Sequence, residues 1–324
     1  MSKFGDCKML KKYVFSLLLV VFNFVFVSSV FAWDDTGHKV SAYIAWRQMT
    51  PEVRAKVIKI LLDAPEDSHL SVYYPAGSRS KEAKELELFM VASTWADIIR
   101  DRDFKVRYEK YNQGSWHYAD IFWKQSGGKA EMMENRSEGM AITKLYDFEK
   151  NLNDTSISDA EKAVNLAWFL HVGGDVHNPL HNASRITETE PKGDQGGNLF
   201  LLSPPDAVAE NRVNLHSYWD SILRRNIPRE NDACDSEYIA EIAEKITKKH
   251  SFSQMKNRLK LGDYKEWNIE GFKLLNQTVY LDELKRGELP SKKYQNRAFA
   301  EGQEQIALAG YRLGEMLNRI FGKN

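Results

Sequence analysis

Two short segments of the chain carry a histidine and an aspartate at the same spacing. His171 and Asp175 are separated by Val-Gly-Gly, and His216 and Asp220 are separated by Ser-Tyr-Trp. Because residues four apart lie on one face of an α-helix, each pair can present an imidazole and a carboxylate together. A metal ion needs several N and O donors that converge, and facing helices supply them two at a time. One such pair is more often a surface pair, but two pairs with His181 nearby predict a metal site.

Three residues nearer the N-terminus add possible donors. His38 follows a glycine, Asp97 ends the segment Ser-Thr-Trp-Ala-Asp, and His117 lies between Trp116 and Tyr118. Taken one at a time, each is more often a hydrogen-bonded core histidine or an aspartate that caps a helix. The functional interpretation therefore depends on the whole set of residues.

The spacing of apolar residues predicts helices that would position these side chains. Thr50-Pro51 is a typical helix start, and Ser158 with Glu161 forms a capping box ahead of an apolar stripe. Further apolar stripes at helical spacing are Ile239, Ile242 and Ile246, and Ile306, Leu313, Leu317 and Ile320. Strand patterns are scarce, and residues 198–202 are the best short candidate. No linker, charge block or repeat divides the chain after residue 32, so we predict one all-α domain over residues 33–324.

Composition excludes several classes of protein. The chain has 324 residues, with 45 Lys and Arg against 45 Asp and Glu. A zero net charge gives no basic face for gripping duplex DNA. Two cysteines cannot build a disulfide framework or a cysteine-based zinc site. The charged fraction of 28% and the aromatic fraction of 12% indicate a globular protein rather than a disordered one.

Residues 1–32 have the pattern of a secretory signal peptide. Four lysines precede an apolar run from Tyr13 to Val27, and Val30 and Ala32 provide small residues two positions apart. This pattern predicts cleavage after Ala32 and a mature chain that starts at Trp33. The alternative is an uncleaved transmembrane anchor, since about 20 apolar residues can span a bilayer. Cleavage predicts a secreted or periplasmic protein that is not attached to a membrane.

Together these segments resemble the zinc-dependent, single-strand-specific class I nucleases of fungi, plants and bacteria. The matching motifs, in order, are Trp33 with Gly37-His38, Trp95-Ala96-Asp97 with Arg100, His117-Tyr118-Ala119-Asp120, the run from Phe169 to His181, Gly196-Gly197-Asn198, and the run from Asn214 to Asp220. The resemblance extends from Trp33 to about Asp220, and the remaining residues are compatible helices. Cysteines that join parts of many eukaryotic members are absent, which indicates a bacterial-type member.

The resemblance implies an all-α fold and three zinc ions, and it assigns ligands position by position. The first zinc would take Asp97, His117, His171 and Asp175; the second His38, Asp175 and the amino nitrogen and carbonyl oxygen of Trp33; the third His181, His216 and Asp220. Asp175 can serve two ions because a carboxylate has two oxygens. A bridged pair of ions can activate a water molecule at neutral pH. His177 lies between two of these ligands but receives no zinc.

The resemblance also implies a reaction. Its members hydrolyse the P–O3′ bond of RNA and single-stranded DNA to 5′-phosphates, and they act on 3′-nucleotides. Asp97 would orient the attacking water and Arg100 would face the charge that develops on phosphate. Tyr118 and Asp120 match a pocket for one unstacked base, and Asn198 is a polar contact near the substrate. Arg100 could instead be an ordinary surface arginine, and Asn198 an ordinary turn residue.

Two other functions remain open at this stage. A three-zinc phospholipase C would use a similar set of ligands on lipid head groups. An exported zinc-binding protein without catalysis would need the donors alone. The segment from His117 to Asp120 favours the nuclease over the lipase, and Asp97 with Arg100 disfavours the non-catalytic alternative. No obligate protein partner is expected.

Overall fold

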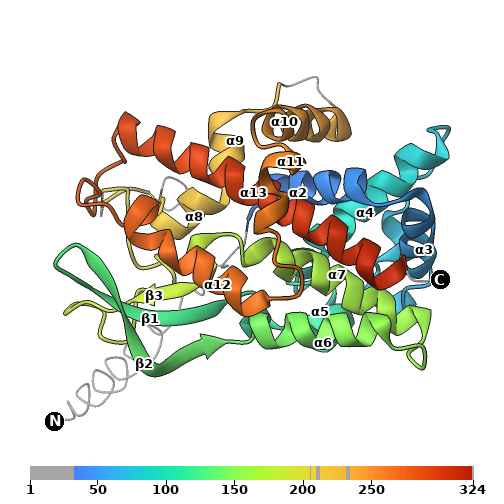
Figure 1. The fold of residues 1–324 in the computed structure, drawn as a ribbon, viewed down its shortest axis with the longest axis horizontal. Coiled ribbons are helices and arrows are strands. Elements are labelled where there is room, and N and C mark those ends of the chain that lie inside the picture. Colours follow the sequence, from blue (N-terminus) through green and yellow to red (C-terminus); the bar gives the residue numbers. More distant parts are fainter. Residues whose placement is uncertain (1–32, 205, 209–211, 231–233, 323–324) are drawn as a thin grey trace, which may run out of the picture. The chain divides into compact units, whose positions relative to one another are not determined.

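The protein is described from a computed structural model (Figure 1). The structure describes residues 33–204, 206–208, 212–230 and 234–322. The predicted signal peptide, residues 1–32, lies outside the described residues. Within the described part of the chain, no helix is both long enough and apolar enough to cross a membrane.

Most of the described chain is helical, as the apolar spacing predicts. The α-helices are α2 (Asp35–Gln48), α3 (Pro51–Leu62), α4 (Lys81–Ile98), α5 (Lys105–Tyr111), α6 (Ala141–Asn153), α7 (Asp159–Asp175), α8 (Leu215–Asp220), α9 (Ile222–Asn226), α10 (Asp235–Lys249), α11 (Phe252–Met255), α12 (Tyr264–Lys273) and α13 (Lys292–Phe321). Short 3₁₀ turns are η1 (Glu66–Ser68), η2 (Ser71–Tyr73), η3 (Gly114–Trp116), η4 (Pro179–His181) and η6 (Lys256–Arg258), and η7 (Leu275–Val279) is a π-helical turn.

The predicted helix starts are confirmed at atomic detail. The Thr50 side chain accepts a hydrogen bond from the backbone N–H of Val53 at the start of α3. The Ser158 side chain accepts from the N–H of Glu161 at the start of α7, which is one of the two hydrogen bonds of the predicted capping box. Each cap satisfies one backbone donor that the first helical turn leaves without an internal partner.

The expectation of an all-α chain needs correction, because the structure contains a small sheet. Strands β1 (Ala119–Ser126), β2 (Lys129–Gly139) and β3 (Ala183–Arg185) lie in the order β2-β1-β3. β1 pairs antiparallel with β2 and parallel with β3. The sheet is seen beside α12 in Figure 1. Most of the β1–β2 hairpin is exposed, so its weak apolar alternation gave no clear strand pattern.

The strand predicted at residues 198–202 is wrong. The backbone there forms turns, and Leu201 makes only an isolated bridge with Asn214. Gln195, Gly196 and Gly197 all have positive φ angles, which reverse the chain just before the predicted strand. The apolar run of Leu199, Phe200, Leu201 and Leu202 was therefore outweighed by the turn that precedes it.

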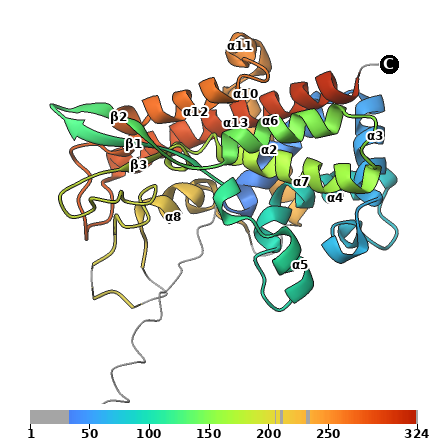
Figure 2. The ribbon, with the colours of Figure 1, turned by 90° about the horizontal axis from the view of Figure 1, so that it is seen from below.

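Helix α7 lies at the centre of the packing. It packs against α4, α6 and α3, and α2 packs in turn against α13 and α10 (Figures 1 and 2). Every residue of α7 from Leu166 to Asp175 is buried. The C-terminal end of α7 therefore places His171 and Asp175 in the interior, where polar groups need a partner.

Candidate metal centre

The first group of donors surrounds Asp175 at the end of α7. His38 Nε2, from α2, lies 3.2 Å from Asp175 Oδ1. On the other carboxylate oxygen, Oδ2, His117 Nδ1 lies at 3.2 Å and His171 Nε2 at 3.3 Å. The two oxygens of one carboxylate thus face different imidazoles, as the predicted bridging role requires.

Asp97 and Arg100 lie at the C-terminal end of α4, next to this group. Asp97 Oδ1 is 3.8 Å from His171 Nε2, and Arg100 Nε is 3.3 Å from the same carboxylate oxygen. Burial raises the pKa of the Asp97 carboxyl to about 7, although Arg100 and His38 act in the opposite direction. Arg100 retains a 19% exposed side chain. It therefore pairs with Asp97 while part of its side chain remains open to solvent.

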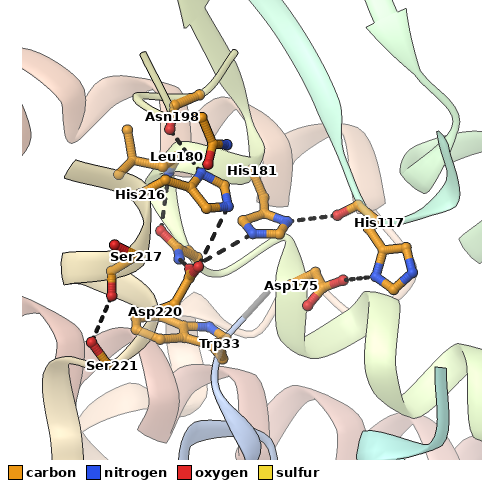
Figure 3. Close-up of polar contacts among 12 residues, drawn as sticks. Trp33, His117, Asp175, Leu180, His181, Asn198, His216, Ser217, Asp220 and Ser221 are labelled. Atoms are coloured by element: carbon orange, nitrogen blue, oxygen red, sulfur yellow. Dashed lines mark hydrogen bonds and ion pairs between the residues drawn. The ribbon is translucent and has the colours of Figure 1, made fainter. Parts of the chain in front are cut away.

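The second group lies between η4 and α8 (Figure 3). His181 Nε2 is 3.9 Å from Asp220 Oδ1, and His216 Nε2 is 3.5 Å from Asp220 Oδ2. All three side chains are buried. Asn178 Nδ2 donates to Asp220 Oδ1 at 2.7 Å and so fixes one side of the carboxylate. Sequence reasoning missed Asn178, although it lies within the motif that ends at His181.

Backbone carbonyls orient three of the imidazole rings. The Nδ1 atoms lie 2.8 Å from the Ser93 carbonyl for His171, 2.7 Å from the His117 carbonyl for His181, and 2.8 Å from the Gly196 carbonyl for His216. If Nδ1 carries the proton and donates it to the carbonyl, Nε2 keeps the lone pair with which an imidazole binds a metal. Each ring is thereby held with Nε2 toward a carboxylate.

Gly196 supplies the carbonyl that orients His216, and only glycine fits there. Its φ is +61°, and a Cβ atom would lie 2.3 Å from the carbonyl oxygen of Leu180. A left-handed backbone and so close an approach both exclude a larger residue. The turn at Gly196 and Gly197, which prevents the predicted strand, thus also helps to form the site.

Several of the donor atoms have no hydrogen-bond partner in the protein, which leaves them able to bind a metal. His38 Nε2, Asp97 Oδ1, Asp175 Oδ1 and His181 Nε2 are buried and make no hydrogen bond. Burial lowers the pKa of His38 to about 4 and lowers the pKa values of His117, His171 and His181 well below the usual range. Neutral imidazoles and carboxylates without hydrogen-bond partners are donors that divalent zinc accepts. Among the described residues, three groups bring donor atoms close enough together to hold a metal ion: His38, Asp97 and His171; His117, His171 and Asp175; and His181, His216 and Asp220.

His177 takes no part in these groups. Its Nδ1 lies 2.7 Å from the Gly173 carbonyl, and its Nε2 lies 2.9 Å from Nη1 of Arg312 in α13. A neutral ring that donates through Nδ1 and accepts through Nε2 is fully satisfied. Its sequence position between His171 and His181 therefore does not make it a donor.

Trp33 is buried between the helices that carry the two groups. Its indole Nε1 donates to the Gly174 carbonyl at 3.0 Å, and the backbone N–H of Asp34 donates to the Asp220 carbonyl at 3.0 Å. Figure 3 shows Trp33 beside Asp220 and Asp175. Trp33, the expected N-terminal residue of the mature chain, therefore lies next to the donor residues Asp175 and Asp220.

The predicted base-pocket residues lie on and beside β1. Tyr118 is half-buried, whereas Asp120 is buried and its Oδ1 has no hydrogen-bond partner. Burial raises the pKa of Asp120 well above its usual range, and Asp194 and Glu138 add to the effect. A buried carboxyl group with a free oxygen is suited to a ligand that offers a hydrogen bond.

Asn198 lies at the turn beside α8. Its Nδ2 donates to the Gln195 carbonyl at 2.8 Å, and its Oδ1 accepts from Asn214, the N-cap of α8, at 3.4 Å. Its amide therefore stabilises the loop that carries Gly196, as a turn residue would. The side chain is half-exposed, so contact with a substrate is sterically possible.

Comparison with known proteins identifies the family. The sequence model of the S1/P1 nucleases matches residues 33–322. The chain belongs to the S1/P1 nuclease family. It is 22% identical to nuclease PA3 of a Penicillium species and to nuclease P1 of Penicillium citrinum, in each case over 90% of this chain and 98% of the relative. It is 24% identical to endonuclease 1 of Arabidopsis thaliana, over 94% of this chain and 92% of the relative. The protein is therefore a nuclease, with the donor groups on the matched part of the chain.

Proposed function

We propose that this nuclease is a secreted, zinc-dependent phosphodiesterase. It hydrolyses the P–O3′ bonds of single-stranded DNA and RNA to 5′-phosphates, and it removes the phosphate of 3′-nucleotides. The observation that carries the proposal is the convergence of buried donors into three groups, two of which share His171. Surface carboxylates gather without a metal, but His38 Nε2, Asp175 Oδ1 and His181 Nε2 are buried and make no hydrogen bond.

Three zinc ions would divide the donors as the family resemblance implies. Asp97, His117, His171 and Asp175 would hold the first; His38, Asp175 and the terminal amino nitrogen and carbonyl of Trp33 the second; His181, His216 and Asp220 the third. Zinc supplies a Lewis acid that makes water a nucleophile at neutral pH and neutralises charge on phosphate. Geometry supports the sharing of Asp175, since one of its carboxylate oxygens faces His38 and the other faces His171. The converging groups differ from this division in one respect, because they join His38 to Asp97 and His171.

Asp97, besides holding zinc, and Arg100 act on the substrate directly. Asp97 accepts a hydrogen bond from the attacking water and orients it toward phosphorus. Arg100 places its guanidinium beside the phosphate oxygens that gain charge as the bond to O3′ breaks and O3′ takes up a proton. The ion pair between Arg100 and Asp97 supports this pairing of roles.

Tyr118 and Asp120 bind one base of the substrate. The half-exposed ring offers a stacking surface, and the free Asp120 oxygen accepts from the base edge. A base inside such a pocket has left its stack, which is easy in a single strand and costly in a duplex. Asn198 contributes a polar contact from the loop before α8.

Export and maturation form part of the proposal. Residues 1–32 act as a signal peptide, and residues 33–324 form the nuclease domain. The match to the family begins at residue 33, and Trp33 is buried against the donor helices, which both support a mature start there. The mature enzyme works outside the cytoplasm without attachment to a membrane.

One assay separates this proposal from its alternatives. Mature protein that starts at Trp33 is incubated with single-stranded DNA, RNA, 3′-AMP and a phosphatidylcholine, with zinc and with a chelator. We expect zinc-dependent cleavage of the first three and 5′-phosphate ends on the fragments. Cleavage of the lipid alone would indicate the phospholipase, and zinc binding without any hydrolysis would indicate a non-catalytic protein.

A further inference from the structure

A cavity of about 640 Å³ lies beside the end of α4, outside the donor groups. It is formed where η1 meets the start of α5, a short helix that projects from the other helices in Figure 2. Its lining residues are Glu66, Asp67, His69, Phe104, Lys105, Val106 and Arg107. The function described above uses none of them.

Arg107 is a buried cation in the wall of this cavity. Arg107 is only 3% exposed, and its Nη2 donates to the Ile98 carbonyl at 3.0 Å. Its Nε is buried without a hydrogen-bond partner. Among the described residues, no carboxylate lies within ion-pair distance of the guanidinium. A desolvated guanidinium without a counter-ion favours binding of an anion, and phosphate matches its fork of donors.

Phe104 provides an apolar surface beside that cation. Its ring lies 4.3 Å from the Arg107 guanidinium carbon, yet the residue is 45% exposed. His69 meets the same ring edge-on at a centroid distance of 5.3 Å. An exposed aromatic ring next to a cation is the combination on which bases of single-stranded nucleic acids stack.

The other charged residues around the cavity are exposed or already paired. Lys105, next to Phe104, lies 3.8 Å from a Glu109 carboxylate oxygen, but the two side chains are 81% and 62% exposed, so the pair is weak and Lys105 can turn to an anion. The Asp67 carboxylate is already engaged by Lys110 and by the Tyr111 hydroxyl. Glu66 is exposed at the rim, where water screens its charge.

A hydrogen bond and a short stretch of chain connect the cavity to the end of α4 that carries Asp97. The carbonyl that Arg107 binds belongs to Ile98, the residue after Asp97. Phe104 follows Arg100 by four residues, which span at most about 14 Å. A stacked strand rises about 3.4 Å per nucleotide, so one strand can reach both places.

We propose that this cavity binds one nucleotide of the substrate strand a few positions from the cleaved bond. The base stacks on Phe104, and a backbone phosphate lies between Arg107 and Lys105. The inference rests on the proposed nuclease function and adds a binding site to it. Long substrates use the cavity, whereas a mononucleotide held at the metal centre does not.

The test compares one variant on two substrates. Phe104→Ala is assayed on 3′-AMP and on a single-stranded oligonucleotide of about twelve nucleotides, within the range of single-strand site sizes. We expect kcat/KM for the oligonucleotide to fall about 5- to 150-fold, the effect of losing one base–aromatic stack, with 3′-AMP hydrolysis unchanged. Phe104→Trp should restore the activity on the oligonucleotide. Leu289→Ala, at another exposed apolar residue, is the matched control and should change neither.

Other results would overturn the inference. An equal loss on both substrates, with an unchanged melting temperature, would place Phe104 in the chemistry rather than in strand binding. An unchanged oligonucleotide activity would show that the cavity does not hold the strand. If the wild-type protein hydrolyses neither substrate, the proposed function fails. In that case, the anisotropy of a labelled oligonucleotide still tests the cavity, because Phe104→Ala should weaken its binding.

Discussion

Trp33 donates its indole N–H to the carbonyl of Gly174, the residue directly before Asp175, at 3.0 Å. The hydrogen bond joins two parts of the chain that are 141 residues apart, and it is buried. The next residue, Asp34, is held by the carbonyl of Asp220. The start of the proposed mature chain is thus attached to both helices that end in a candidate donor carboxylate.

Removal of the signal peptide should therefore complete the metal centre. A free amine donates its lone pair to zinc, whereas a peptide nitrogen is planar and conjugated. The ordinary pKa of a terminal amine is about 7.7–8.0, and a nearby zinc favours the neutral form of the amine. We expect protein that starts at Trp33 to bind more zinc and to cleave faster than protein with one extra Met. Mass spectrometry confirms the two termini; equal zinc content and equal rates would remove Trp33 from the ligands.

Asp97 and Asp120 should fail in different ways when each is changed to asparagine. Asp97→Asn removes the charge that faces His171 and Arg100, so turnover should fall at least about a hundredfold. Asp120→Asn should alter base preference and raise KM while turnover persists, because Asp120 lies outside the donor groups. Steady-state kinetics on oligonucleotides of different base composition separates the two effects. Identical profiles would contradict the division between metal and base roles.

Zinc binding should release protons at pH 6. Burial raises the pKa of Asp97 to about 7, so its carboxyl is mostly protonated there in metal-free protein and must ionise to bind zinc. His38, with a pKa of about 4, is already neutral. The part of the zinc affinity that depends on Asp97 should therefore rise with pH up to about 7 and then level off. Calorimetry in two buffers of different ionisation enthalpy counts the protons.

Two variants check the source of those protons. Asp97→Asn should release about one proton fewer at pH 6, since its side chain has no proton to lose. Asp120→Asn is the matched control, because the pKa of Asp120 is also raised by burial but its carboxyl is not a donor. Equal proton release by Asp97→Asn and wild type would argue against Asp97 as a ligand.

Removal of zinc should lower activity and thermal stability together. The donors come from α2, α4, α7, α8 and the segments around His117 and His181, and the described Cys234 is a free thiol. Metal ions that bind only the folded chain stabilise it by mass action. Calorimetry before and after chelation, with zinc measured by atomic absorption, tests this. A melting temperature unchanged by verified metal loss would refute the structural role, and added zinc should restore both properties.

Arg312 should contribute strongly to stability although it lies outside the catalytic groups. This buried residue donates to His177 and to the Leu259 carbonyl, and it forms an ion pair with Glu270. Burial lowers its pKa to about 10, so it stays charged at neutral pH. Arg312→Ala should cost about 3–5 kcal/mol, since it leaves buried partners unsatisfied. Arg297→Ala, exposed on the same helix, should change the denaturant midpoint little; equal effects would refute the assignment.

The local features of the site were predictable from the sequence. His171 with Asp175, and His216 with Asp220, occupy α7 and α8 at the predicted spacing, because four residues make about one helical turn. The caps at Thr50 and Ser158 were predictable for the same reason, since they depend on neighbouring residues alone. The order of the motifs was enough to indicate the family.

Tertiary structure decided which side chains meet. Asp175 faces His38 with one oxygen and His117 and His171 with the other, and no spacing along the chain encodes that convergence. His177 lies only two residues from Asp175, yet it turns to Arg312 instead. The helical period determines which residues share one face of a helix. Which residues pack against that face depends on segments far away in the sequence. The carbonyls of Ser93, His117 and Gly196 that orient the rings are likewise supplied by the folded backbone, whatever the side chains at those positions.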